Sequence, residues 1–121
     1  MASQLRAFAG SDATQRRMAL ENLAHSAPDD RVLPALAAGL VDGDWQVRLA
    51  AARSLGAVGR GWVWSGAAGE EIDQAMRALI SAFDDARAEV RIETMQSLEA
   101  IYTAARAFWS PGRRAAGATE R

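Results

Sequence analysis

The stretch that decides the fold is VRLAAARSL at Val47–Leu55, because a near copy, VRIETMQSL, recurs at Val90–Leu98. The valine, arginine, serine and leucine coincide when the two stretches are aligned. A third and weaker copy, QRRMALENL, precedes both and occupies Gln15–Leu23. Self-similarity at a period of about 20–50 residues is typical of repeat proteins. The first spacing is shorter than the second, and we assign the difference to a glycine- and tryptophan-rich insertion loop at 59–69.

Each copy has the spacing of an amphipathic helix. Val47, Ala51 and Leu55 recur every four residues, which favours one buried helical face. Asp12, Asp44 and Asp85 stand at expected helix starts, where a carboxylate can accept hydrogen bonds from free backbone amides. The sequence predicts helices at residues 3–9, 12–25, 31–41, 44–58, 70–83 and 86–109.

These helices pair into three hairpins, at about 3–25, 31–58 and 70–102. Each hairpin has an apolar face that it cannot bury alone, so neighbouring hairpins must stack. The sequence therefore predicts an all-α fold, a short right-handed α-solenoid of about three stacked helical hairpins in one domain at 1–109. The segment 110–121 contains a proline, two glycines and three arginines, and we expect it to be a flexible tail.

Composition argues against several classes of function. All 14 basic residues are arginine, and 15 acidic residues bring the formal charge to −1, so no overall field attracts phosphate or an anionic membrane. The chain has no cysteine and one histidine, His25, which excludes thiolate chemistry and any two-histidine metal site. No stretch approaches the ~20 apolar residues of a membrane span. We expect a cytoplasmic protein that is not an enzyme and has no catalytic residue, cofactor or metal.

From about residue 11 to residue 102 the repeats resemble HEAT repeats, in particular the HEAT-like repeats of the phycobilin-lyase type. The shared signature is an aspartate, then Val-Arg, then a small residue and a leucine. It is present here as Asp42, Val47, Arg48, Ala51 and Leu55, and again as Asp85, Val90, Arg91, Thr94 and Leu98.

This resemblance implies a structural ladder in which Arg48 and Arg91 reach aspartates, Asp42 and Asp85, between neighbouring repeats. Repeat one has Gly10 at the aspartate position, so its contact is in doubt. The resemblance also implies that the second helix of each hairpin lines a concave surface.

The side chains expected on that concave face have charges that nearly cancel. Phosphate binding needs clustered cations, so this face suits a protein or peptide partner of mixed polarity better. Arginine is enriched at interface hot spots, which favours Arg53 as a central residue. The expected partner-binding residues are Arg17, Glu21, Gln46, Leu49, Arg53, Glu89, Ile92, Gln96 and Glu99.

The insertion loop is a second candidate surface because it contains Trp62 and Trp64. One ring is expected to be buried against the second and third repeats, and the other is expected to be available to a partner. The alternative is that both rings cover the seam between the second and third repeats. Exposed apolar surface at the solenoid ends also allows a homodimer.

Together these features favour a non-catalytic adaptor or regulatory protein that binds a protein or peptide on its concave face. A nucleic-acid-binding or DNA-glycosylase-like HEAT domain is the main alternative, because such domains bind duplex along a basic concave face. An accessory piece of a phycobilin-type lyase is a third. The repeated His-Glu pairs of HEAT-like hydroxylases are absent from this sequence.

Overall fold

The computed structural model describes residues 12–26, 29, 31–66 and 69–109. Within these ranges every regular element is helical, which confirms the predicted all-α fold. The expected helix at 3–9 and the expected tail lie outside the described residues. The elements are α2 (Ala13–Asn22) with a 3-10 turn (Leu23–His25), α3 (Val32–Gly39), α4 (Trp45–Ser65), α5 (Gly69–Ile80) and α6 (Ala88–Phe108).

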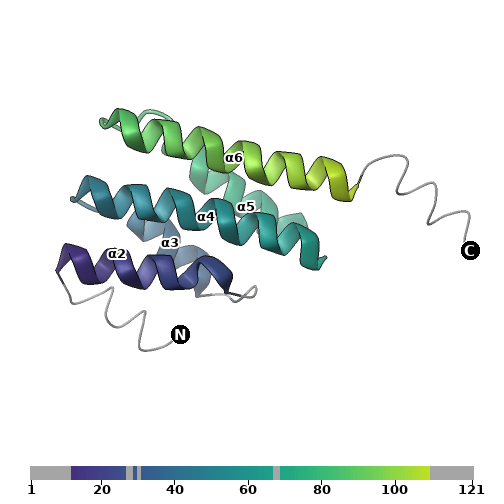
Figure 1. Cartoon of the computed structure of the whole chain (residues 1–121), viewed down its shortest axis with the longest axis horizontal. Coiled ribbons are helices and arrows are strands. Elements are labelled where there is room, and N and C mark those ends of the chain that lie inside the picture. The colour runs from purple at the N-terminus through teal and green to yellow at the C-terminus, as the bar shows by residue number, and fades with distance from the viewer. Residues whose placement is uncertain (1–11, 27–28, 30, 67–68, 110–121) are drawn as a thin grey trace, which may run out of the picture.

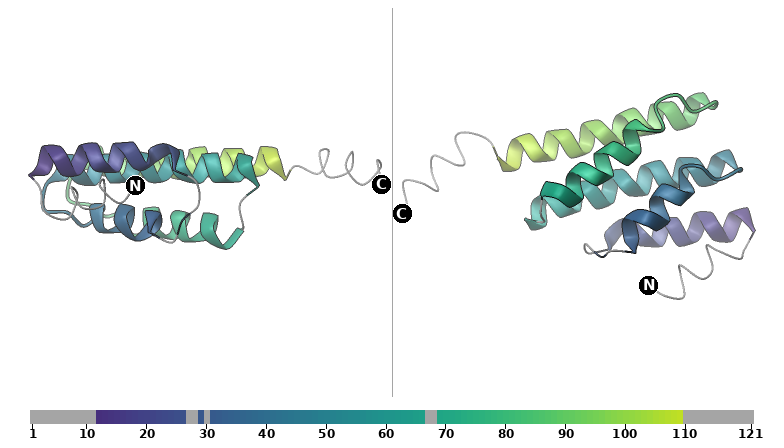
Figure 2. Two further views of the ribbon diagram at one scale, coloured as in Figure 1. Left: turned by 90° about the horizontal axis from the view of Figure 1, so that it is seen from below. Right: turned by 180° about the vertical axis from the view of Figure 1, so that it is seen from behind.

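The helices form two layers. Figure 1 shows α2, α4 and α6 side by side in the front layer, while α3 and α5 lie behind them. The two further views in Figure 2 show the same two layers from below and from behind. The pairs α3–α4 and α5–α6 are consecutive hairpins, and α4 lies between its neighbours in the front layer. The arrangement is a short HEAT-like solenoid in which each repeat packs on the next.

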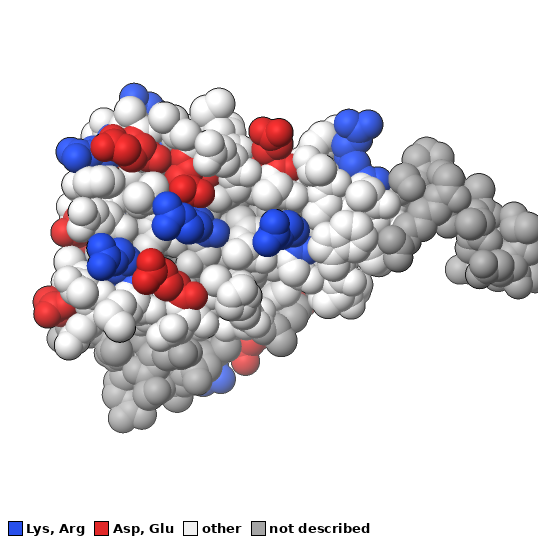
Figure 3. All heavy atoms as spheres, in the orientation of Figure 1, with Lys and Arg blue, Asp and Glu red and all other residues white. Residues whose placement is uncertain are grey.

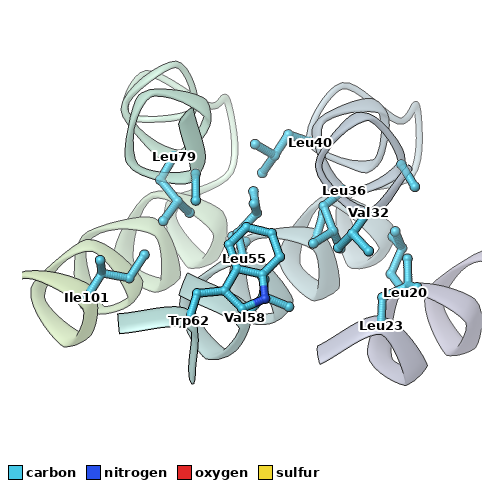
Figure 4. Close-up of a cluster of buried hydrophobic side chains, with 14 of the residues drawn as sticks. Leu20, Leu23, Val32, Leu36, Leu40, Leu55, Val58, Trp62, Leu79 and Ile101 are labelled. Atoms are coloured by element: carbon cyan, nitrogen blue, oxygen red, sulfur yellow. The ribbon is translucent and has the colours of Figure 1, made fainter. Parts of the chain in front are cut away.

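The core lies between the two layers and receives side chains from every repeat. Leu20, Leu36, Leu55, Leu79 and Ile101 each have 0% of their surface exposed. Figure 4 shows these side chains converging from both layers. Burial of one such side chain contributes about 1.5–3 kcal/mol, so the shared core holds the stack together.

Aspartates begin two of the helices as the sequence predicts. Asp12 accepts a hydrogen bond from the Gln15 amide at 2.9 Å, and Asp44 accepts one from the Gln46 amide at 2.8 Å. The prediction that Asp85 caps α6 is wrong, because the N-cap of α6 is Arg87, which makes no side-chain cap bond. Asp85 instead accepts from the Arg87 amide at 2.9 Å and fixes the turn before the helix.

The predicted insertion loop is also wrong over most of its length. Helix α4 continues through Gly59 to Ser65 and ends at Gly66, whose φ of 79° is a conformation that suits glycine. A Cβ at Gly59 would lie 2.5 Å from Ile101 Cδ1, so glycine here allows α6 to pack closely against α4. Burial of Trp62 and its neighbours offsets the roughly 1 kcal/mol that glycine costs a helix.

Candidate functional site

The surface of α2, α4 and α6 that points away from α3 and α5 is called the second-helix face below. It faces the viewer in Figure 3, where basic and acidic side chains are interspersed. Of the nine residues expected on the concave face, Arg17 and Leu49 are partly buried, and the other seven are exposed. None of the nine residues is buried in the core, and their role in binding stays a prediction.

Charges on this face are partly neutralised within the protein. Arg53 on α4 reaches Glu93 on α6, with 3.2 Å between Nη2 and Oε1 and 3.4 Å between Nε and the same oxygen. The Arg53 side chain is 59% exposed, so water screens much of this attraction. Because Arg53 is paired with Glu93, it is less available to bind the phosphates of a nucleic acid.

A groove of about 490 Å³ lies between the C-terminal halves of α4 and α6. Two expected residues, Gln96 and Glu99, line it together with Arg60 and Trp64, which the concave-face prediction omits. Small side chains complete the lining, so the groove is open to an incoming side chain. These further lining residues are Ala100, Thr103, Ala104 and Ala107.

Helix α4 explains why Arg60 and Trp64 join this face. They follow Arg53 by seven and eleven residues, and side chains at these spacings share one side of a helix. Trp64 is 49% exposed, and its ring meets Phe108 edge-on with 6.0 Å between centroids. The spacing from Arg53 can be read from the sequence. The concave-face prediction omits Arg60 and Trp64 because both lie in the segment that was assigned to a loop.

The two tryptophans have different surroundings. Trp62 is 3% exposed, and its indole Nε1 donates to the Ser26 carbonyl oxygen at 2.9 Å. Trp62 is therefore part of the core, and its assignment as a partner-binding loop residue is corrected. On a helix, a spacing of two residues places side chains on nearly opposite sides, whereas on an extended strand it places them on the same side. The helix therefore separates Trp62 from the exposed Trp64.

Arginine–aspartate pairs connect neighbouring repeats. Arg16 donates to Asp42 at 2.8 Å and 3.1 Å, and Arg48 donates to Asp85 at 2.8 Å and 3.2 Å. Each arginine thus reaches the turn of the next repeat with a bidentate contact, a geometry that strengthens such pairs. Arg91 instead donates through Nη1 to the Asp85 carbonyl oxygen at 2.6 Å.

The ion pair between Arg16 and Asp42 was not predicted, because the expected ladder residues do not include Arg16. The alignment that places Arg16 over Arg48 is the signal that could have found it, and the aspartate it needs belongs to repeat two rather than repeat one.

Burial and hydrogen bonds shift the pKa values of the two ladder carboxylates, Asp42 and Asp85. Burial opposes ionisation of Asp42, but hydrogen bonds from Arg16 and the Asp44 amide outweigh it, so its pKa lies below the usual value. Asp85 behaves alike: burial opposes its ionisation, yet hydrogen bonds from Arg48 and the Arg87 amide lower its pKa. Both aspartates are therefore charged at neutral pH and hold the repeats together.

A second groove, of about 570 Å³, lies between α3 and α5 in the other layer. Its charged lining is entirely acidic, formed by Asp29, Glu70 and Glu71, with an edge of the buried Trp62. Across the described ranges, no group of three His, Cys, Asp or Glu could hold a metal ion. No helix in the same ranges is long and apolar enough to cross a membrane.

Comparison with known families agrees with this architecture. A family model described as HEAT repeats matches residues 3–99, and the chain therefore belongs to the HEAT-repeat family. Members of this family are generally non-catalytic scaffolds and commonly mediate protein interactions. No curated protein matches the chain significantly. The match is to HEAT repeats as a whole, and the closer likeness to the phycobilin-lyase type stays a prediction.

Proposed function

We propose that this protein is a non-catalytic adaptor or regulatory module that binds a protein or peptide on its second-helix face, centred on the groove between α4 and α6. The observation that carries the proposal is the lining of that groove, where Arg60, Trp64 and Glu99 surround small alanine side chains. Tryptophan and arginine are the side chains most enriched at interface hot spots.

The chemistry of the groove defines the kind of segment it suits. Ala100 and Ala104 leave room for an apolar side chain beside the half-exposed indole of Trp64. Arg60 and Glu99 supply one charge of each sign, so the polar flanks of the ligand meet opposite partners. An amphipathic peptide with one apolar anchor and mixed charges satisfies both requirements.

The charge pattern favours a protein ligand over nucleic acid. Cations on the second-helix face alternate with carboxylates, and Arg53 is already paired with Glu93. A duplex needs several unneutralised cations in a row to displace its counterions, which gives a steep salt dependence. The acidic groove between α3 and α5 would repel a phosphate backbone outright.

A random-peptide display library selected against the immobilised protein tests this proposal. Peptides that enrich should contain an aromatic or aliphatic anchor flanked by charges, and their affinity should be measured by fluorescence anisotropy. Trp64→Ala and Arg60→Glu should each weaken binding by about tenfold or more, the loss of a moderate hot spot. Arg53→Glu should weaken it less, because Arg53 is shared with Glu93.

The matched control is Arg77→Glu on α5, an exposed arginine in the other layer whose side chain is 77% exposed. Its peptide affinity should equal that of the natural chain. Selection of peptides that bind Trp64→Ala and the natural chain equally well would remove the groove from the proposal. Duplex DNA that binds as tightly as the best peptide at physiological salt would favour the nucleic-acid alternative.

A further inference from the structure

Figure 1 shows α6 at the end of the helical stack, with α4 beside it. Ser97 and Ile101 of α6 lie against Gly56 and Gly59 of α4, so the side chains about half a turn from them form a stripe on the opposite side of α6. It consists of Ala88, Arg91, Met95, Glu99 and Tyr102, and is called the terminal stripe. Met95 is 59% and Tyr102 is 55% exposed. No further helix of the described ranges packs on this side of α6.

The preceding repeat shows what such a stripe does. In the alignment that places Val47 over Val90, the α4 residues Arg48, Gly56 and Gly59 correspond to Arg91, Glu99 and Tyr102 of α6. These α4 residues contact the next repeat: Arg48 pairs with Asp85, and the two glycines pack on α6 side chains. The terminal stripe therefore occupies the position of a repeat-stacking surface.

The same comparison argues against a further repeat of the same kind. Gly56 and Gly59 allow close contact with the next helix, whereas Glu99 and Tyr102 at the corresponding positions are large. A helix that packs on the terminal stripe must interdigitate with these side chains at a greater separation. In Arg48, the atoms Nε and Nη2 donate to the Asp85 carboxylate. The same two atoms of Arg91 have no acceptor among the described residues.

The side chains of the terminal stripe are complementary to the same side chains taken in the opposite order along the helix. Arg91 and Glu99 lie four residues before and after Met95, while Ala88 and Tyr102 lie seven before and after it. In an antiparallel pair of α6 helices crossing at Met95, residues equally far from the crossing point face each other. Each arginine then faces a glutamate, and each tyrosine faces an alanine, so both charge and size match.

We propose that two copies of this chain form a dimer through the terminal stripe, with the α6 helices antiparallel and the two-fold axis near Met95. This gives a closed, isologous interface in which the same residues serve both copies. A head-to-tail arrangement offers less, because repeat one has Gly10 where the other repeats place the aspartate that accepts from an arginine. The proposal does not depend on the peptide-binding groove, although Glu99 borders both surfaces.

Cysteine cross-linking gives the sharpest test, because the natural chain has no cysteine. A disulfide needs Cα atoms within about 7 Å, so only a residue close to the two-fold axis can link to its own copy. Met95→Cys should cross-link under mild oxidation, as judged by a non-reducing gel. Met18→Cys on α2, at 53% exposure a matched control, should stay monomeric. Equal cross-linking of the two variants would overturn the proposal.

Sedimentation equilibrium over a range of concentrations tests the charges. The mass should rise from 12.9 kDa to twice that value and no further. Arg91→Glu or Glu99→Arg places like charges together at two symmetric contacts and should raise the dimer Kd about tenfold or more. The double variant restores opposite charges and should return to nearly the natural Kd.

Circular dichroism and Tm measured on each single variant separate loss of the dimer from loss of the fold, since Arg91 also bonds to the Asp85 carbonyl. A folded double variant that dimerises no better than the single variants would overturn the proposal. So would a natural chain that stays monomeric at every concentration, or a mass that grows beyond the dimer, which indicates open polymerisation through unlike ends.

Discussion

Two glycines on α4, Gly56 and Gly61, allow a direct test of the close packing between α4 and α6. A Cβ at Gly56 would lie 2.6 Å from Ser97 Cβ and Oγ and 2.9 Å from Ser97 Cα. A Cβ at Gly61 would meet nothing within 4 Å. The same substitution to alanine, on the same helix, should therefore change stability in opposite directions.

The magnitudes follow from two opposing terms. Alanine stabilises a helix over glycine by about 0.8–1 kcal/mol, and Gly61→Ala should keep most of this gain. At Gly56 the same gain is opposed by overpacking, which typically costs about 1–3 kcal/mol and occasionally more. Since Ser97 Cα is one of the clashing atoms, a rotamer change cannot relieve the contact, and Gly56→Ala should lose about 1–2 kcal/mol net.

Thermal and urea unfolding followed by circular dichroism provide the measurement. For a chain of this size about 1 kcal/mol moves Tm by roughly 4 °C, so Gly61→Ala should melt a few degrees higher and Gly56→Ala several degrees lower. The urea m-value should stay unchanged in both variants, because the surface exposed on unfolding is nearly the same. If Gly56→Ala proved as stable as Gly61→Ala, the close approach of the two helices would be refuted.

Three further outcomes test the ladder and the core. Arg48→Ala leaves the Asp85 carboxylate, whose side chain is 8% exposed, without its ion-pair partner and should lower the free energy of unfolding by about 2–4 kcal/mol. As a control, Arg77→Ala breaks only an exposed pair and should change the free energy of unfolding by less than about 0.5 kcal/mol. Because the pKa of Asp42 is lowered on folding, its contribution is complete above the unfolded pKa of about 3.9 and declines as pH falls towards the folded value. An acid titration of stability should be shallower for Asp42→Asn, and an identical profile would contradict the assignment. Trp62→Phe loses the hydrogen bond to the Ser26 carbonyl and some core volume, so urea unfolding should show a loss of about 1–3 kcal/mol, with little change for Trp64→Phe.

Much of the fold could be predicted because its pattern is local and repeated. The recurrence of the Val-Arg stretch identifies paired helices, and helical spacing identifies the buried positions, such as Val47 and Leu55 at 0% exposure. Asp12 and Asp44 mark helix starts because capping depends on amides only two or three residues away. These features involve short distances along the chain, so sequence spacing carries them.

The candidate site was predicted less completely. Exposed positions on α4 and α6 follow from helical spacing, but the groove between these helices depends on how closely they approach. Arg60 was omitted, and Trp64 was assigned to a separate loop surface, for one reason, the loop predicted at the glycine-rich segment. Local propensity favours a break there, whereas burial of Trp62 and its neighbours favours continuation, and burial outweighs propensity.

The sequence by itself determined the helical repeat, its stacking and the mixed charge of its surface, since each of these is set by residue type and spacing. Only the tertiary structure decided that Gly59 lies inside a helix, because the reason for glycine there is Ile101, which belongs to the next repeat. The structure also shows the ion pair between Arg16 and Asp42 of the following repeat, to which the alignment of Arg16 with Arg48 could have pointed. Contacts between separate helices depend on their relative positions in space, and spacing within one helix carries no record of those positions.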